Sequence, residues 1–323
     1  MVECKIFLAG EFISTSQTLS VTNKYTGKLF TNTFLADKKV LDKAIVAAQN
    51  AKQACKELSS NQKFIALKYI SEELEKNKKD LGKVLSIESG KPITYAIGEI
   101  ERAAQTFLIA AEECKRLPKE YMSLDWTVNG KNKEGLVNYF PIGIVAGISP
   151  FNFPMNLAVH KIAPAIAAGC PIILKPASST PLSTLELAHI ISRTDLPKGM
   201  VSILPMDRTT GNLLVTDDRI NLLSFTGSPA IGWELKKQSG KKKVVLELGG
   251  NAGVIISKNT DLKKILQKCL GGAFSYSGQI CIHAQRFFVH LDLFDEFLNL
   301  MSIGAQKLLN GDPIKKETQV SNM

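Results

Sequence analysis

The chain lacks the cysteine patterns that bind metal ions or cross-link small secreted domains. Its six cysteines stand at positions 4, 55, 114, 170, 269 and 281 without a Cys-x-x-Cys pair, and its four histidines have no metal-ligand spacing to them. We therefore expect no metal site, and free thiols fit a reducing compartment. No basic segment followed by an apolar one opens the sequence, so the expected location is the cytoplasm.

Long apolar runs and clustered basic residues are also missing. The longest apolar run, residues 157–174, is interrupted by His160, Lys161, two prolines and a glycine, which argues against a membrane span. The net charge of +10 arises from lysines spread along predicted helices, and no aromatic-rich basic motif accompanies the densest run, residues 241–243. Neither a membrane nor a nucleic acid is expected as a partner.

The first 140 residues have mainly helical patterns. A short N-terminal β-hairpin precedes helices predicted over residues 36–58 and 61–88, the first with Asp37 as its N-cap. Residues 89–92, Ser-Gly-Lys-Pro, break the chain before a third helix over residues 93–117. Residues 124–140 contain Asn-Gly and predict two extended segments around a tight turn.

From residue 143 onward, short apolar runs alternate with helical patterns. Runs at residues 144–148, 172–174, 201–204 and 222–225 indicate strands, and the alternation predicts a parallel sheet covered by helices on both faces. With 323 residues, of which 45% are hydrophobic, two domains are expected. Ligands of such sheets bind beyond the carboxyl ends of the strands, where Ser149, Lys175 and Thr226 lie.

The common dinucleotide motif Gly-x-Gly-x-x-Gly is absent, but residues 225–232 close a strand and open a helix. Ser228 is a candidate cap, and Pro229 suits the first helical turn. The positive end of that helix would face a ligand such as a pyrophosphate. A plain strand-turn-helix connection without a ligand is the alternative.

Three side chains are candidates for covalent chemistry. Cys281 follows the small, polar residues 275–279, which suit a turn at a cavity, although free cysteines are often buried apolar residues. Glu247 stands in the apolar strand 243–248, where a carboxylate can become a general base or simply point outward by alternation. Asn152 is either an oxyanion donor or an ordinary turn asparagine.

Five segments together resemble the aldehyde dehydrogenase superfamily, in its order and spacing. They are residues 149–154, 175–178, 225–228, 246–251 and 278–281. The resemblance implies an α/β fold with a discontinuous, Rossmann-like NAD(P)-binding domain over residues 1–122 and 142–249. It also implies a β oligomerisation arm over residues 123–141, and the first part of an α/β catalytic domain over residues 250–323.

The resemblance implies a role for each candidate side chain. Cys281 attacks an aldehyde to form a thiohemiacetal, and hydride transfer then leaves a thioester. Asn152 and the Cys281 backbone N–H bind the oxyanion, and Glu247 activates the water that hydrolyses the thioester. Because Glu247 is present, the non-acylating branch is expected. Lys161 is either an electrostatic aid near the site or a solvated helix lysine.

The resemblance also implies a set of cofactor contacts. They are Ile148, Ser149, Phe151, Lys175, Ser178, Gly211, Phe225, Thr226, Gly227, Ser228, Ile231, Leu248 and Gly249. Ser178 occupies a position where many NAD-preferring members carry glutamate, so a 2′-phosphate is not repelled and Lys175 can pair with it. We expect NADP to be accepted at least as well as NAD.

Family members continue well past residues 311–313, so we interpret the chain as a C-terminally truncated form. The predicted activity is NAD(P)-dependent oxidation of a small-molecule aldehyde to a carboxylic acid. A homo-oligomer, dimer or tetramer, is expected for the full-length form. The alternative is a catalytically inactive nucleotide-binding fragment or scaffold. Hydroxyaldehydes, phosphorylated aldehydes and dicarboxylic semialdehydes remain open as substrates.

Overall fold

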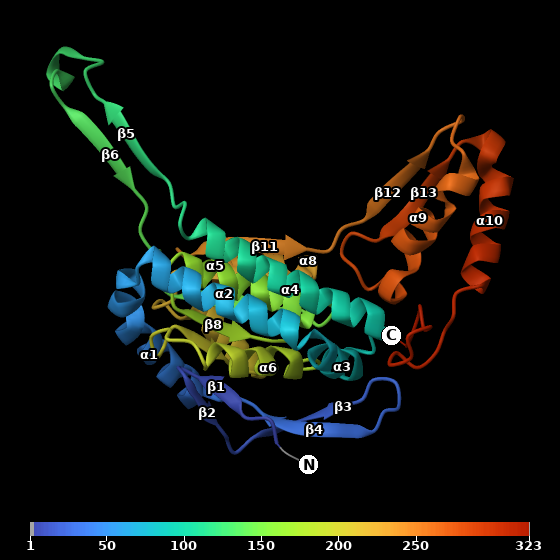
Figure 1. The fold of residues 1–323 in the computed structure, drawn as a ribbon, viewed down its shortest axis with the longest axis horizontal. Coiled ribbons are helices and arrows are strands. Elements are labelled where there is room, and N and C mark those ends of the chain that lie inside the picture. Colours follow the sequence, from blue (N-terminus) through green and yellow to red (C-terminus); the bar gives the residue numbers. More distant parts are fainter. Residues whose placement is uncertain (1–2, 323) are drawn as a thin grey trace.

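A seven-stranded sheet forms the centre of the computed structural model, which describes residues 3–322 (Figure 1). Its order is β11-β10-β7-β8-β9-β1-β2. The parallel strands are β7 (Val145–Ile148), β8 (Ile172–Lys175), β9 (Val201–Ile203), β10 (Leu222–Gly227) and β11 (Lys243–Leu248). The antiparallel hairpin β1 (Ile6–Leu8) and β2 (Glu11–Ile13) extends it, so the predicted parallel sheet is confirmed within a mixed one.

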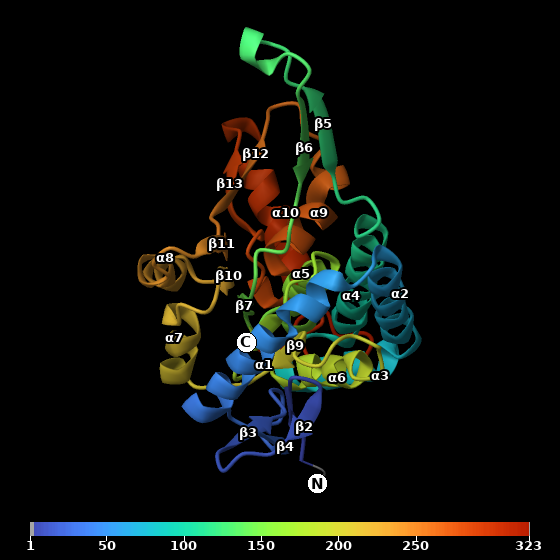
Figure 2. The ribbon, with the colours of Figure 1, turned by 90° about the vertical axis from the view of Figure 1, so that its left-hand side faces the viewer.

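Helices cover both faces of this sheet, as predicted (Figure 2). One face carries α2 (Ser60–Lys76), α3 (Lys78–Ser89), α4 (Ile93–Glu113), α5 (Pro154–Ala167) and α6 (Leu182–Ile191). The other carries α7 (Arg208–Thr216), α8 (Pro229–Gln238) and the first half of α1 (Lys38–Glu57). The central strands are therefore buried on both sides, which explains their continuous Ile, Val and Leu content.

The ends of the first three predicted helices differ in how well the sequence predicts them. Asp37 caps α1 by accepting a 2.8 Å hydrogen bond from the Val40 N–H, as predicted. The single helix predicted over residues 61–88 is wrong. It is interrupted at Asn77, whose side-chain amide and backbone N–H both donate to the Glu73 carbonyl, at 2.7 and 3.1 Å, a local side-chain bond of the kind that favours helix ends. The third helix begins at Ile93 as expected but ends at Glu113, short of residue 117.

A second N-terminal hairpin, β3 (Thr18–Thr22) and β4 (Leu29–Phe34), was not predicted. The arm consists of β5 (Lys119–Ser123) and β6 (Glu134–Asn138) and projects away from the sheet (Figure 1). The predicted tight turn at Asn-Gly is wrong, because Ser123 pairs with Glu134 and residues 124–133 form a longer loop with one 3-10 turn. Large apolar side chains are exposed on the arm at Tyr121, Trp126, Val128, Leu136, Tyr139 and Phe140.

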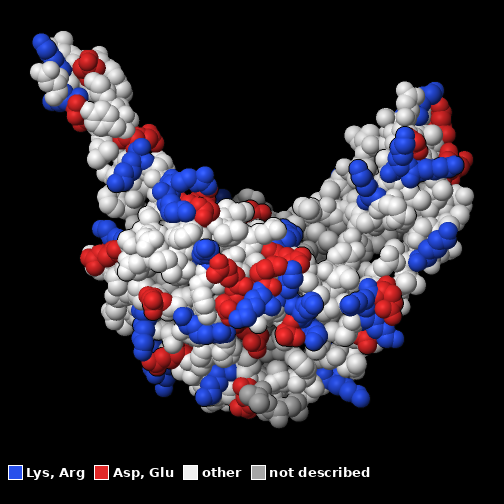
Figure 3. Space-filling view, in the orientation of Figure 1, with Lys and Arg blue, Asp and Glu red and all other residues white. Residues whose placement is uncertain are grey.

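The C-terminal lobe is a smaller α/β unit at the other end of the molecule (Figure 1). Its parallel strands β12 (Ala252–Ile256) and β13 (Ala284–Val289) pack with α9 (Leu262–Phe274) and α10 (Phe294–Gln306) around a small apolar cluster. The 3-10 turns η2 (Ser275–Gly278) and η3 (Leu291–Leu293) flank β13. The space-filling surface is hollowed between the arm and this lobe, and its acidic and basic side chains are interspersed (Figure 3). Within residues 3–322, none of the helices is both apolar and long enough to cross a bilayer.

Candidate functional site

The carboxyl ends of four parallel strands bring the predicted cofactor residues to one edge of the sheet. In the observed register Ile148 lies opposite both Lys175 and Phe225, and Thr226 lies opposite Glu247. Because all four strands run in the same direction, the segments that follow them emerge on the same side. The sheet therefore gathers residues that are up to about a hundred positions apart in the sequence.

A cavity of about 780 Å³ opens at this edge. Among the predicted cofactor residues, those that line it are Ile148, Lys175, Ser178, Gly211, Phe225 and Ile231. The others, which do not line it, are Ser149, Phe151, Thr226, Gly227, Ser228, Leu248 and Gly249. The structure adds lining residues that sequence reasoning missed: Arg208, Thr209, Asn212, Leu213, Glu234, Leu235 and Gln238. The first four belong to α7, whose start could have been recognised in the sequence from its N-cap, Asp207. The Asp207 carboxylate accepts a hydrogen bond from the Thr210 N–H at 2.7 Å.

Lys175 is one of the charged side chains that line the cavity, with Arg208 and Glu234. Its ammonium donates a long 3.5 Å hydrogen bond to the Pro176 carbonyl, and its methylenes pass over Gly211, where a Cβ would lie 2.9 Å from the lysine Cε. Burial lowers the pKa of Lys175, and the nearby Asp207 carboxylate opposes that shift. A cation held this way gains from an anionic or hydroxyl-bearing ligand.

The turn from β10 into α8 has the predicted proline but lacks the predicted side-chain cap. Pro229 occupies the first turn, whereas the Ser228 hydroxyl makes no capping hydrogen bond within the described residues. The aromatic ring of Phe225 fills the space beside Gly227, where a Cβ would lie 2.5 Å from the ring. The first N–H groups of α8 are thus left without a side-chain acceptor, as an anion-binding helix end requires.

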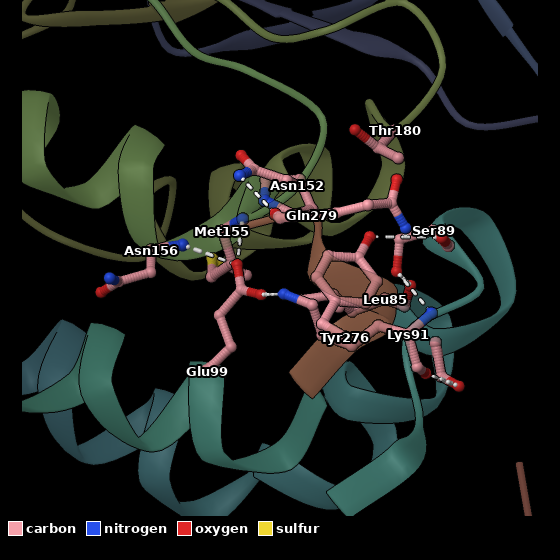
Figure 4. A network of polar contacts seen from close by, with 12 residues as sticks. Leu85, Ser89, Lys91, Glu99, Asn152, Met155, Asn156, Thr180, Tyr276 and Gln279 are labelled. Atoms are coloured by element: carbon pink, nitrogen blue, oxygen red, sulfur yellow. Dashed lines mark hydrogen bonds and ion pairs between the residues drawn. The ribbon is translucent and has the colours of Figure 1, made fainter. Parts of the chain in front are cut away.

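Cys281 is exposed, whereas Cys55, Cys114, Cys170 and Cys269 are buried. The interpretation of Cys281 as a buried apolar residue is therefore wrong. Two other segments approach it. The Gly250 N–H donates to the Cys281 carbonyl at 3.3 Å. The Asn152 side-chain amide donates to the Gln279 carbonyl at 2.8 Å (Figure 4).

The run before Cys281 has an uncommon backbone. Tyr276, Ser277 and Gly278 all have left-handed φ angles, of 49°, 53° and 75°. For the two non-glycine residues this conformation costs about 1–2 kcal/mol each. Side-chain anchors hold them: the Tyr276 hydroxyl donates to the Ser89 carbonyl at 3.3 Å, and the Ser277 hydroxyl donates to the Ser321 carbonyl at 2.7 Å. The tight bend that leads to Cys281 is therefore enforced by residues far away in the sequence.

Glu247 and Lys161 both lie beside Thr226 of β10: Glu247 is its partner on β11, and Lys161 contacts its hydroxyl. Glu247 is exposed on β11, so the outward orientation by alternation is observed and an apolar enclosure is not. Lys161 is buried, not solvated, and its ammonium donates to the Thr226 hydroxyl at 2.7 Å and to the Ser224 hydroxyl at 3.2 Å. Burial lowers the pKa of Lys161 to about 8, against an opposing effect of the Glu247 carboxylate.

The sequence of the chain is similar to those of known proteins. The aldehyde dehydrogenase family model matches residues 12–323. A 3-sulfolactaldehyde dehydrogenase of Priestia aryabhattai is 34% identical over 319 residues, which are 98% of this chain and 66% of that protein.

Two solved structures are similar over nearly the whole chain. Aldehyde dehydrogenase 21 of Physcomitrella patens, in complex with the reaction product succinate, matches with a TM-score of 0.96 and 42% identity, over 98% of this chain and 67% of that one. The NADP-dependent glyceraldehyde-3-phosphate dehydrogenase of Bacillus halodurans, complexed with NADP, matches with a TM-score of 0.96 and 29% identity, over 99% of this chain and 68% of that one. The chain thus spans about two thirds of the length of these relatives.

Proposed function

The chain belongs to the aldehyde dehydrogenase family, and we propose that it carries the nucleophile and cofactor site of an NAD(P)-dependent, non-acylating oxidation of an aldehyde to a carboxylic acid. The observation that supports this most directly is the meeting of the Asn152 amide with the exposed loop of Cys281 at the ligand-binding edge of the sheet. The chain spans only 66% of the length of the 3-sulfolactaldehyde dehydrogenase. The complete oxidation reaction is therefore proposed and not observed.

Cys281 begins the reaction as a thiolate that attacks the aldehyde carbon and forms a thiohemiacetal. The oxyanion needs donors, and the Asn152 side-chain nitrogen carries two hydrogens. One of them is used by the Gln279 carbonyl, and the other remains for the oxyanion. A donor of this kind contributes roughly 2.7–4 kcal/mol in comparable acyl-transfer sites.

The cofactor residues fit a dinucleotide. The Ser149 hydroxyl is buried and has no hydrogen-bond partner within residues 3–322, Lys175 has unused donors, and the uncapped start of α8 suits a diphosphate. When bound, the dinucleotide supplies the hydride acceptor. Ser178 and Arg208 line the cavity near Lys175, with no carboxylate at position 178, so NADP should bind at least as well as NAD.

Glu247 completes the reaction by taking a proton from the water that hydrolyses the Cys281 thioester. Its exposed carboxylate can reach solvent, and Lys161 behind Thr226 provides a buried positive charge on the same side of the sheet. The presence of this carboxylate supports hydrolysis in place of acyl transfer to a thiol.

We expect a short aldehyde with a polar or anionic group as the substrate. Two of the relatives are named as dehydrogenases of 3-sulfolactaldehyde and of glyceraldehyde 3-phosphate. The third, aldehyde dehydrogenase 21, is in complex with its product succinate. We further propose that the exposed apolar side chains of the β5–β6 arm pair with a neighbouring subunit in a cytoplasmic homo-oligomer.

The test is NADPH and NADH production by the chain over a panel of short hydroxy-, phospho-, sulfo- and carboxyaldehydes. Cys281→Ala should abolish production, whereas Cys269→Ala, which changes a buried cysteine of the same lobe, should retain it. Production that survives Cys281→Ala would refute the assigned nucleophile. Cofactor binding without production in any sample would leave a nucleotide-binding role in place of the dehydrogenase.

A further inference from the structure

A buried ion pair lies beneath the candidate active site. Lys91, directly after α3, contacts Glu99 of α4, and both side chains are fully buried (Figure 4). Burial lowers the pKa of Lys91, and the Glu99 carboxylate opposes that shift. A buried ion pair is seldom retained for stability alone, because desolvation offsets the attraction between the charges. The pair is therefore expected to serve another purpose.

The Lys91 ammonium also contacts two aromatic rings. It lies 3.7 Å from the centre of the Phe153 ring and 4.4 Å from the centre of the Tyr276 ring. The two rings meet edge-to-face, with 6.1 Å between their centres. A desolvated cation between two π-faces attracts both, so Lys91 draws together two segments that are far apart in sequence.

Each ring belongs to a segment that carries a reactive group. Phe153 directly follows Asn152, and Tyr276 begins the left-handed run that leads to Cys281. Glu99 strengthens the same junction, because one of its oxygens accepts hydrogen bonds from the Met155 and Asn156 N–H groups, both at 3.0 Å. These N–H groups form the first turn of α5, which follows the Asn152 loop.

We propose that Lys91 is a positioning residue, which clamps the Phe153 and Tyr276 rings and thereby holds Asn152 and the Cys281 loop in their reactive arrangement. The inference rests on the proposed function, because only that function makes Asn152 and Cys281 reactive groups. The effect of Lys91 on the order of the two loops does not depend on it. Two direct contacts also link the segments, the Asn152–Gln279 hydrogen bond and the edge-to-face contact of the two rings. Lys91 adds the charged group that contacts both rings at once.

The test is the double variant Lys91→Met/Glu99→Gln. Methionine keeps the length of the chain without the charge, and the glutamine oxygen can still accept from the start of α5, so no unpaired charge is buried. The matched control is Lys115→Met/Glu112→Gln. It removes a lysine that lies 4.0 Å from the centre of the Phe64 ring and 2.6 Å from the Glu112 carboxylate, away from the site.

Hydrogen exchange of residues 275–283 is the first measurement, because it needs no turnover. The Gln279 and His283 amides are hydrogen-bonded within this segment and report its order. In the Lys91→Met/Glu99→Gln variant these amides should exchange about tenfold faster, with unchanged exchange in strands β7, β8 and β10. Exchange like that of the unaltered chain, or acceleration spread equally over the sheet, would overturn the proposal.

Steady-state kinetics are the second measurement. If the chain turns over an aldehyde, kcat of the Lys91→Met/Glu99→Gln variant should fall about 100-fold, because misplacement of reacting groups is costly. The KM for NADP should change less than about threefold, because the cofactor cavity does not include Lys91. An equal loss in the Lys115→Met/Glu112→Gln control would overturn the clamp. No turnover in the unaltered chain would defeat the dehydrogenase proposal and leave the exchange result to decide on Lys91.

Discussion

Burial of Lys161 in α5 makes the free energy of unfolding depend on pH. Lys161 is only 5% exposed, and its pKa falls from the ordinary 10.5 to about 8 in the folded protein. Between these values the unfolded chain binds more protons than the folded one. Stability should therefore rise with pH in that window. Below the folded pKa the penalty for burying the charged lysine is fully present, and it is relieved as pH rises toward the unfolded pKa.

The size of the effect follows from the two pKa values of Lys161. A shift from 10.5 to about 8 corresponds to about 3.4 kcal/mol in total, of which about 2 kcal/mol is gained between about pH 7 and about pH 9.5. In Lys161→Met this gain is absent. The loss of the hydroxyl contacts at Ser224 and Thr226 also destabilises the variant, but that loss does not depend on pH in this range.

Urea unfolding of both proteins at about pH 7, 8 and 9.5 isolates the lysine, because other titrating groups cancel in the difference. The unfolding free energy of the unaltered chain relative to Lys161→Met should increase by about 2 kcal/mol over this range. Glu247→Gln should move the window to lower pH, since that carboxylate raises the pKa of Lys161. A constant difference, or the same change in the exposed-site control Lys79→Met, would refute the reasoning.

Three further outcomes follow from single contacts. Asn152→Ala should lower kcat about 100- to 1,000-fold with a small change in KM, measured by NADPH absorbance; an unchanged kcat would exclude the amide as oxyanion donor. Ser178→Glu should weaken NADP binding more than NAD binding in calorimetric titrations, and equal losses would contradict the cavity assignment. Asp37→Ala should reduce the unfolding free energy by about 1 kcal/mol, while no change would mean that the cap bond is not stabilising.

The parallel core was predictable because its signals are local. The apolar runs that become β7 and β8 are buried on both faces, and such strands need no long-range information to be recognised. The cap at Asp37 was predictable for the same reason. The break at Asn77 was not, because its side-chain bond to the Glu73 carbonyl is added to the backbone bond there and leaves the apolar spacing undisturbed.

The remaining errors arise from packing between distant segments. Asn129-Gly130 has the composition of a tight turn, but β5 and β6 pair only up to Ser123 and Glu134, so the two residues lie inside a longer loop. Lys91 and Glu99 look like ordinary surface charges in the sequence, and only the structure shows that both are buried and contact the loops of Asn152 and Tyr276. Cys281, Glu247 and Asn152 were identified through the family resemblance of their segments, and their roles stay predictions until they are measured.

The most direct measurement of the central claim is a single turnover of Glu247→Gln with NADP and the best aldehyde. Hydrolysis should be blocked, so each chain should form one NADPH and retain one acyl group on Cys281, with a mass gain equal to the aldehyde less two hydrogen atoms. Peptide mass spectrometry locates the group. NADPH formed without an acyl group on Cys281, or an acyl group on another residue, would contradict the account.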